Sequence, residues 1–322
     1  MPDLRDDVRE LFVAVTTGEP DGLWSAPGRI VLLGCEDGSS LSIAIDRRTI
    51  VAAGPRDDAV LRVVSAEFDQ AVEIPLADLE RVRGSAGWAG LPLGVAWALG
   101  RSGADLAAVP GVDLVVESNV PVGAGLGSSA ALASAVALAL DDLWRLGFDR
   151  PELAQAGLLA EAEFAGLEPK PGDHLASLLG RHDAALLVDI RGEVESIDAG
   201  LAAVGVTVLV IETGLESSNV AVSPEQFSDA ADALRARDFD AFARAIDESD
   251  NAGSEASLAA ETARENGARA VRMTSGGTLI ALAPLDAVSR IQVALDGAFA
   301  EHGFSAPEVY AVRPSDGAAR DA

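Results

Sequence analysis

With 322 residues, of which 49% are hydrophobic and 23% charged, the chain is long enough for two domains and too apolar for global disorder. The formal net charge of −27 would repel nucleic acid and argues against nonspecific DNA or RNA binding. No uncharged apolar run reaches 18 residues, so we expect no membrane span. Residues 1–7 are acidic and lack an apolar signal core, and the single cysteine, Cys35, excludes an intrachain disulfide. Both observations favour the cytoplasm.

The first half of the chain predicts alternating strands and helices. We expect a polar helix over residues 7–15, and a Pro-Gly turn at 27–28 that opens an apolar strand. Further strands are predicted at residues 41–45, 49–53, 59–65, 70–75 and 111–118, and helices at residues 87–99, 130–146 and 151–164. Trp88 and Trp97 lie in the first of these helices, where we interpret both as core residues.

The second half begins after a Pro- and Gly-rich break at residues 166–174. Helices are predicted at residues 175–179, 223–245, 254–267 and 285–299, and strands at residues 184–189, 204–212, 278–283 and 306–312. The residues after Pro314 are expected to fray. This order of elements favours an α+β fold with two lobes, and the change of pattern near residues 180–200 predicts domains at 1–190 and 191–322.

The strongest chemical signal lies in residues 120–131, which read Val-Pro-Val-Gly-Ala-Gly-Leu-Gly-Ser-Ser-Ala-Ala. A glycine-rich loop that leads into a helix exposes backbone N–H groups, and the helix dipole there favours an anion. The loop is not a Walker A motif, because no Gly-Lys-Ser or Gly-Lys-Thr occurs in the chain. It is not a dinucleotide fingerprint either, because the segment that follows is helical. We interpret it as a loop that binds the phosphates of a nucleotide.

Two charged residues elsewhere each allow two interpretations. Arg29 stands beside the Pro-Gly turn, where it either points into a cleft or is solvated at the turn. Asp173 follows a second Pro-Gly pair at a helix start, where it is either an N-cap or a catalytic carboxylate. The spacing alone does not decide between these alternatives.

Residues 121–131 resemble the ATP loop of the GHMP small-molecule kinases, among which the galactokinases are nearest. Four more stretches resemble further motifs of this family, in the family's order: residues 26–34, 87–99, 160–180 and 268–277. The resemblance covers most of the chain. It implies an N-terminal ribosomal-S5-like α/β domain and a C-terminal ferredoxin-like α+β domain, with ATP and Mg²⁺ as cofactors.

The resemblance also implies roles for individual residues. Asp173 would receive or polarise the proton of the sugar hydroxyl, and Arg29 beside it would stabilise charge on the transferring phosphoryl group. Ser129, or its neighbour Ser128, would bind Mg²⁺ together with Glu161. The nucleotide-binding set comprises Gly123, Gly125, Leu126, Gly127, Ser128 and Ser129.

The chain departs from the family on the sugar side. The family's first motif continues Gly-Glu-His-Thr-Asp-Tyr-Asn, whereas here Gly34 is followed by the shorter Cys-Glu-Asp-Gly-Ser-Ser, in which Glu36 and Asp37 would partly substitute as sugar ligands. The third motif has lost one of two glycine clusters. Lys170, the only lysine, would either pair with the Asp173 carboxylate or a phosphate, or lie on the surface. His174 replaces the family's glutamine and is interpreted as a surface residue in preference to a sugar contact.

Three functional hypotheses remain open on the sequence. The leading one is ATP-dependent phosphorylation of a sugar hydroxyl, with galactose as the default from the resemblance and a monomer as the acting form. The retained glycine loop, Arg29, Glu161 and Asp173 favour it. The shortened first and third motifs favour a paralogue that binds sugar or nucleotide without catalysis. The altered loop at residues 35–40 also allows a kinase for another small alcohol.

Overall fold

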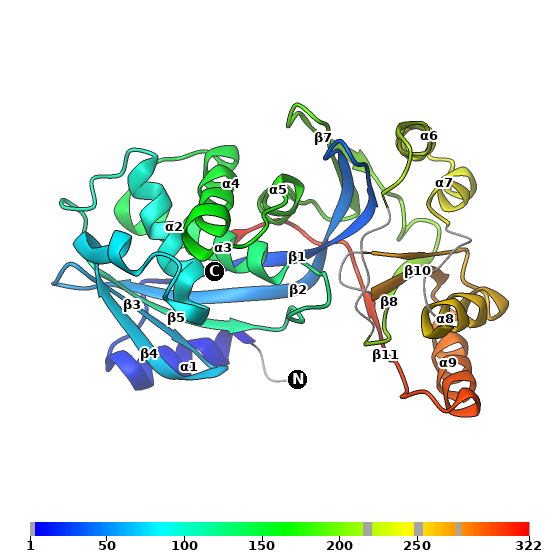
Figure 1. Cartoon of the computed structure of the whole chain (residues 1–322), viewed down its shortest axis with the longest axis horizontal. Helices are drawn as coiled ribbons and strands as arrows, with labels where there is room; N and C mark the ends of the chain where they lie inside the picture. The colour runs from blue at the N-terminus through cyan, green and yellow to red at the C-terminus, as the bar shows by residue number, and fades with distance from the viewer. Residues whose placement is uncertain (1–3, 215–220, 248–253, 275–277, 322) are drawn as a thin grey trace.

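The computed structural model describes residues 4–214, 221–247, 254–274 and 278–321. Two β-sheets with their helices form two lobes that lie side by side along the long axis of the molecule (Figure 1). No helix in these ranges is both long and apolar enough to cross a membrane.

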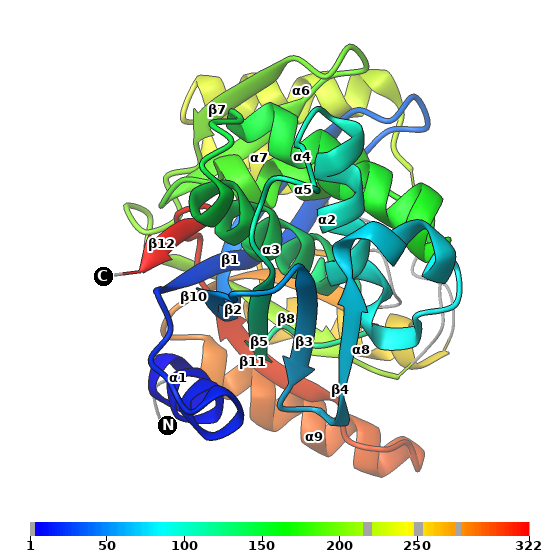
Figure 2. The ribbon, with the colours of Figure 1, turned by 90° about the vertical axis from the view of Figure 1, so that its left-hand side faces the viewer.

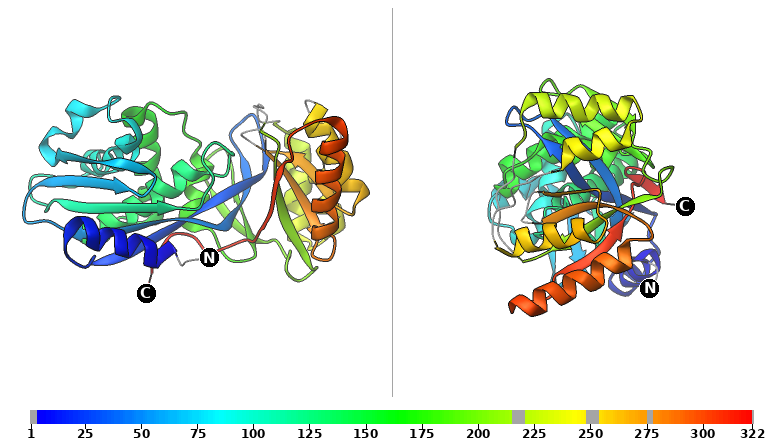
Figure 3. Two further views of the ribbon diagram at one scale, coloured as in Figure 1. Left: turned by 90° about the horizontal axis from the view of Figure 1, so that it is seen from below. Right: turned by 90° about the vertical axis from the view of Figure 1, so that its right-hand side faces the viewer.

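The first sheet has eight strands in the order β12-β1-β2-β5-β3-β4, with β6 added to β2 and β7 to β6. Its strands are β1 (Gly22–Gly34), β2 (Ser40–Pro55), β3 (Val60–Ser65), β4 (Phe68–Pro75), β5 (Val112–Ser118), β6 (Ala184–Val188), β7 (Val194–Asp198) and β12 (Ala319–Asp321). β1 and β2 are long enough to reach from the first lobe to the second, as Figure 3 shows from below. They connect the two lobes.

One face of the first sheet is covered by four helices, which bury an alanine- and leucine-rich core against it. They are α2 (Gly90–Arg101), α3 (Ser128–Trp144), α4 (Arg150–Leu159) and α5 (Pro171–Leu179). The amphipathic α1 (Leu4–Thr16) packs on the other face through Val8 and Phe12 (Figure 2). Short helical turns η1 (Leu76–Val82) and η2 (Gly87–Ala89) precede α2, and the π-helix η3 (Ala160–Ala165) extends α4.

The second sheet is antiparallel, with the strand order β11-β8-β10-β9. Its elements are β8 (Val206–Glu212), α6 (Pro224–Arg235), α7 (Phe239–Ile246), α8 (Ser254–Glu265), β9 (Ala270–Met273), β10 (Thr278–Pro284), α9 (Val288–His302) and β11 (Glu308–Val312). Helices α8 and α9 pack on one face, and α6 and α7 on the other. The βαββαβ order is that of a ferredoxin-like lobe, which confirms the predicted fold class.

The lobes share a hydrophobic core. Ile30 of β1, Ile43 of β2 and Leu126 of the glycine loop pack in one cluster with Val208 of β8 and Ile280 of β10. The chain also returns to the first lobe at its end, where β12 pairs with β1. The boundary between residues 190 and 191 lies in the turn between β6 and β7, which pair in the first sheet, and it stays a prediction.

Two local expectations are wrong. The pair at residues 27–28 is no turn, because β1 continues through it with a bulge between Pro27 and Arg29, a position at which a strand tolerates proline. The segment after Pro314 is not frayed, because Arg48 anchors it. The Arg48 guanidinium donates to the carbonyls of Asp316 (2.8 Å) and Gly317 (2.9 Å).

Candidate active site

The glycine loop leads from β5 to the N-terminus of α3. Gly123, Gly125 and Gly127 all have positive φ (85°, 71° and 77°), a conformation that only glycine adopts without strain. Gly127 is the N-cap residue, and no side chain caps the helix. The first-turn N–H groups of Ser128 and Ser129 are therefore available to an anion, and the helix dipole favours one there.

Arg29 fixes the loop from the side of β1. Its backbone N–H donates to the Leu126 carbonyl (2.7 Å), and Nη1 donates to the Gly125 carbonyl. Gly28 allows this approach, because a Cβ there would lie 2.7 Å from the Leu126 oxygen. The Leu126 side chain is fully buried in the shared core, so only its backbone reaches the site. The loop and the arginine thus form one rigid unit.

Arg29 also forms a two-pronged ion pair with Asp173. Nε donates to Oδ1 (2.7 Å), and Nη2 donates to Oδ2. The arginine is 3% exposed, so the interpretation as a solvated turn residue is wrong. Asp173 is not an N-cap either. Lys170 occupies that position, and the Asp173 side chain points to Arg29 instead.

Helix α5 lies close against β1 and β2, and this sets the position of Asp173. The Ser177 hydroxyl donates to the Pro27 carbonyl (2.8 Å) beneath the helix. A Cβ on Gly172 would collide with the Ser40 hydroxyl, and one on Gly180 would collide with the Ala44 methyl. The glycines therefore bring the helix, and with it Asp173, onto the strands that carry Arg29.

A second carboxylate, Glu161, is buried in η3 beside α5. Its Oε2 lies 2.9 Å from Nε2 of His174, and the two residues are 4% and 0% exposed. Both interpretations of His174 are therefore wrong, because a fully buried ring cannot be a surface residue or touch a sugar. Lys170, by contrast, is exposed at the start of α5.

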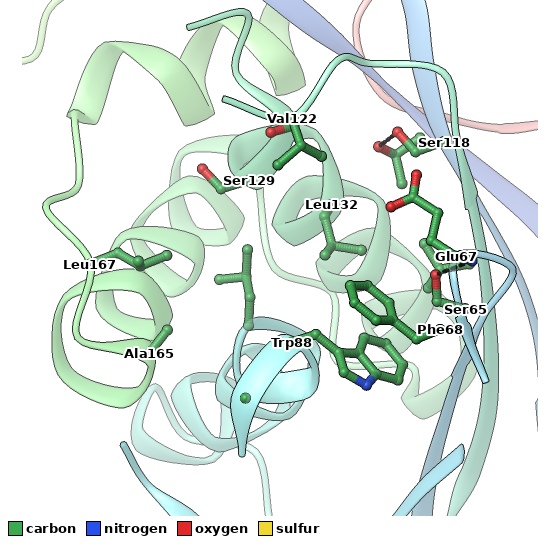
Figure 4. A pocket seen from close by; sticks show the side chains of 15 residues that line it. Ser65, Glu67, Phe68, Trp88, Ser118, Val122, Ser129, Leu132, Ala165 and Leu167 are labelled. Carbon is green, nitrogen blue, oxygen red and sulfur yellow. Dashed lines mark hydrogen bonds between the residues drawn. The ribbon is translucent and has the colours of Figure 1, made fainter. Parts of the chain in front are cut away.

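An apolar cavity of about 390 Å³ adjoins the N-terminus of α3 (Figure 4). Phe68 and Trp88 stack along one wall, with ring centroids 4.9 Å apart and planes 7° from parallel. The opposite wall includes Ser129 of α3 together with Ala165 and Leu167 at the end of η3. The cavity is thus continuous with the predicted phosphate site and has the size and lining of a small-molecule pocket.

The second lobe holds the glycine loop from its other side. The Thr278 hydroxyl donates to the Ala124 carbonyl (2.8 Å), and the Thr274 hydroxyl donates to the Val31 carbonyl (3.3 Å). These threonines flank the rest of the third motif, residues 275–277, which lies outside the described residues.

Glu36 and Asp37 lie in the turn between β1 and β2. Both are exposed, and they line a hollow together with residues 221–224 of the second lobe. Asp37 Oδ1 accepts the backbone N–H of Ser39 (2.8 Å), so this carboxylate supports the turn itself. Burial, with the charge of Asp37, raises the pKa of the neighbouring Cys35 thiol. In the described part of the chain, no hydrogen bond joins this turn to Arg29 or Asp173.

Glu161 and Ser129, the residues predicted to hold Mg²⁺, carry oxygen donors that suit this ion. Carboxylate and hydroxyl oxygens are the ligands that this ion prefers, and it needs few of them from the protein. In the part of the chain that the structure describes, Glu161 has no arginine or lysine partner, so a bound cation would compensate its buried charge.

Comparison with known proteins places this site in a family. The model of the GHMP kinases N terminal domain matches residues 90–181, and the galactokinase galactose-binding signature matches residues 10–55. A galactokinase of Streptomyces coelicolor is 31% identical, with 97% of each chain covered. The chain belongs to the galactokinase family. The 384 aligned positions exceed the 322 residues of this chain, so this member lacks segments that its relative carries.

Solved structures agree on the fold. A Lactococcus lactis galactokinase in complex with galactose matches with a TM-score of 0.85 at 21% identity, over 99% of this chain and 100% of that one. A mevalonate kinase of Methanococcus jannaschii matches with a TM-score of 0.69 at 13% identity, over 91% and 98%. This galactokinase-family chain therefore has the common architecture of the GHMP kinases.

Sequence reasoning missed two features of the site. Trp88 was expected in the core, as Trp97 is, yet it is half-buried and forms a pocket wall with Phe68. A positive-φ glycine at residue 87 precedes it and signals that the helix starts later. No pattern in the sequence around Glu161 or His174 predicted that the two side chains pair.

Proposed function

We propose that this galactokinase-family chain is itself an active galactokinase, which transfers the γ-phosphoryl group of ATP to the anomeric hydroxyl of galactose. The observation that carries the proposal is the Arg29–Asp173 pair, which is fixed through the Gly125 carbonyl to the loop that leads into α3. Phosphoryl transfer depends mainly on positioning and on charge stabilisation, and this unit supplies both.

In this proposal ATP lies across the first lobe. The adenine enters the apolar cavity beside Phe68 and Trp88, and the phosphates reach the N–H groups of Ser128 and Ser129. Leu167, which is 49% exposed at the cavity, covers the base. Glu161 and Ser129 would hold Mg²⁺, which neutralises charge on the phosphates when it is bound.

Asp173 acts on the acceptor. Its carboxylate accepts the proton of the sugar hydroxyl as that oxygen forms a bond to the γ-phosphorus and the bond from phosphorus to the β–γ bridging oxygen breaks. ADP leaves with that oxygen, and the proton passes to solvent after release of the sugar phosphate. Arg29 orients the carboxylate and stabilises charge on the transferring group.

A coupled assay of ADP release across a panel of sugars and small alcohols tests the activity. Galactose-dependent turnover is the expected result. Turnover only with another alcohol would mean that the chain is a kinase for that alcohol and not for galactose. The short turn at Cys35–Ser40, which differs from the family's sugar motif, would then explain the change of acceptor. Binding of ATP without any turnover would show a non-catalytic paralogue.

We further propose that the protein acts as a monomer in the cytoplasm. The single cysteine, which can form no intrachain disulfide, suits a reducing compartment. Arg29, Asp173 and the cavity beside α3 all belong to one chain, so the candidate site as described needs no residue from a second copy. Light scattering at assay concentration tests the monomer, for which the expected mass is 33.0 kDa.

A further inference from the structure

His174 directly follows the proposed catalytic aspartate, yet its side chain faces another part of the site. Asp173 points from α5 to Arg29 on β1, whereas His174 points from the same helix turn to Glu161 in η3. One turn of α5 therefore carries one of the carboxylates that the proposed reaction uses, Asp173, and contacts the other, Glu161.

The arrangement of the buried His174 and Glu161 side chains shows which atom donates the hydrogen bond between them. A carboxylate oxygen accepts, so Nε2 of His174 donates to Oε2 of Glu161. Nδ1 is buried without a partner among the described residues. A hydrogen on Nδ1 would be an unpaired buried donor, so the tautomer with its hydrogen on Nε2 fits the site best.

The neighbouring helix accommodates the ring. Gly157 of α4 lies against it, and a Cβ at that position would lie 2.5 Å from Nδ1 and 2.8 Å from Cε1 of His174. The ring therefore packs closely against Gly157 through Nδ1 and Cε1, and its Nε2 holds Oε2 of Glu161. In the described structure, Oε1 of Glu161 accepts no hydrogen bond and is available to a cation.

We propose that His174 is a positioning residue for the metal-binding carboxylate of Glu161, on the basis of its buried Nε2–Oε2 hydrogen bond and of the ring's close packing against Gly157. The proposal rests on the proposed function, because it takes Glu161 to be the Mg²⁺ ligand. Loss of a hydrogen bond that orients a ligand typically weakens metal binding 10- to 100-fold.

The test measures the metal directly rather than turnover. Mn²⁺ replaces Mg²⁺ as a probe, and electron paramagnetic resonance reports free Mn²⁺ during a titration of the full-length protein saturated with ADP. His174→Leu fills the buried position with an apolar side chain that cannot donate, so we expect the Kd for Mn²⁺ to rise about 10- to 100-fold. His174→Gln carries an amide donor and should keep the Kd close to that of the unaltered protein.

Two comparisons separate positioning from a merely structural role. His302→Gln, on the exposed end of α9, is the control and should change nothing. Gly157→Ala keeps both partners but displaces the ring, so it should also weaken Mn²⁺ binding. This variant tests the proposal independently if His174→Leu fails to fold.

Each outcome is decisive. Unaltered Mn²⁺ affinity in His174→Leu or in Gly157→Ala would overturn the proposal, as would a Gln variant as impaired as the Leu variant. Failure of this proposal can be told apart from failure of the proposed function. If the proposed function fails, the unaltered protein releases no ADP with any acceptor, whatever its affinity for Mn²⁺.

Discussion

The glycine loop, which we propose binds ATP, and the β1–β2 turn, which we propose lies on the acceptor side, are held in different ways. The glycine loop is fixed from both lobes, by Arg29 on one side and Thr278 on the other. In the turn at residues 35–39, Glu36, Asp37 and Gly38 are exposed. The turn is supported by its own hydrogen bonds, from the Asp37 carboxylate and between the backbones of Cys35 and Ser39. All members of a kinase family bind the same phosphates, whereas their acceptors differ. Proteins that must bind one common group and one variable group usually place the common site on a rigid scaffold and the variable site on a surface loop.

The same difference predicts how substitutions act. Changes that disturb Arg29 or Asp173 should alter kcat and stability together, because these two residues and the loop form one hydrogen-bonded unit. Changes at the turn should alter only the KM for the acceptor. Four predictions test this contrast, from the largest expected effect to the smallest.

Asp173→Asn should have the largest effect. The amide cannot accept the acceptor's proton, so we expect kcat to fall about 10²- to 10⁴-fold, while the Kd for ATP stays near its original value. Steady-state ADP release and calorimetric titration with a nonhydrolysable ATP analogue measure the two quantities. Asp286→Asn, an exposed change in the second lobe, is the matched control. Normal turnover by the Asn variant would remove Asp173 from the mechanism.

Arg29→Lys ranks next. Lysine keeps the positive charge but lacks the planar fork that reaches Asp173 and the Gly125 carbonyl together. We expect kcat to fall about 10²-fold, and Tm to fall as well, because an unpaired buried group costs about 1–3 kcal/mol. Thermal unfolding and ADP release measure both effects. Arg81→Lys, whose side chain is 80% exposed, controls for the substitution type. A variant with lower Tm but full kcat would limit Arg29 to a structural role.

Prediction from sequence succeeded where a motif is short and its backbone requirement is local. Gly127 needs positive φ, so the glycine loop before a helix was predicted from its residues alone. The role of Arg29 came from the family resemblance, because the residues by themselves predicted a turn where β1 has a bulge. Prediction failed where burial depends on a distant partner. His174 is buried because Gly157 of another helix leaves room for its ring, and no local pattern encodes that contact. The return of β12 to β1 depends similarly on Arg48.

Two glycine substitutions in the loop distinguish the effect of backbone strain from the effect of packing against Arg29. Gly127 and Gly123 both have positive φ, so alanine at either should cost about 1–2 kcal/mol. Only Gly127 faces Arg29, since a Cβ there would lie 3.0 Å from the arginine Cγ, whereas nothing lies within 4 Å of one at Gly123. We therefore expect Gly127→Ala to lower kcat about tenfold, through displacement of Arg29, and Gly123→Ala to retain kcat. Equal kcat in the two variants would contradict this coupling.

Glu36→Gln should have the smallest effect and tests the turn. Glu36 has no hydrogen-bond partner among the described residues, so its removal disturbs no internal contact. If it binds a sugar hydroxyl, one hydrogen bond of about 1 kcal/mol predicts a roughly fivefold rise in the KM for galactose, with kcat, Tm and the KM for ATP unchanged. Glu308→Gln, at an exposed position of β11, is the control for charge. A parallel rise in the KM for ATP would mean that the turn and the glycine loop are coupled, and that the acceptor side is not free to vary independently of the phosphate side.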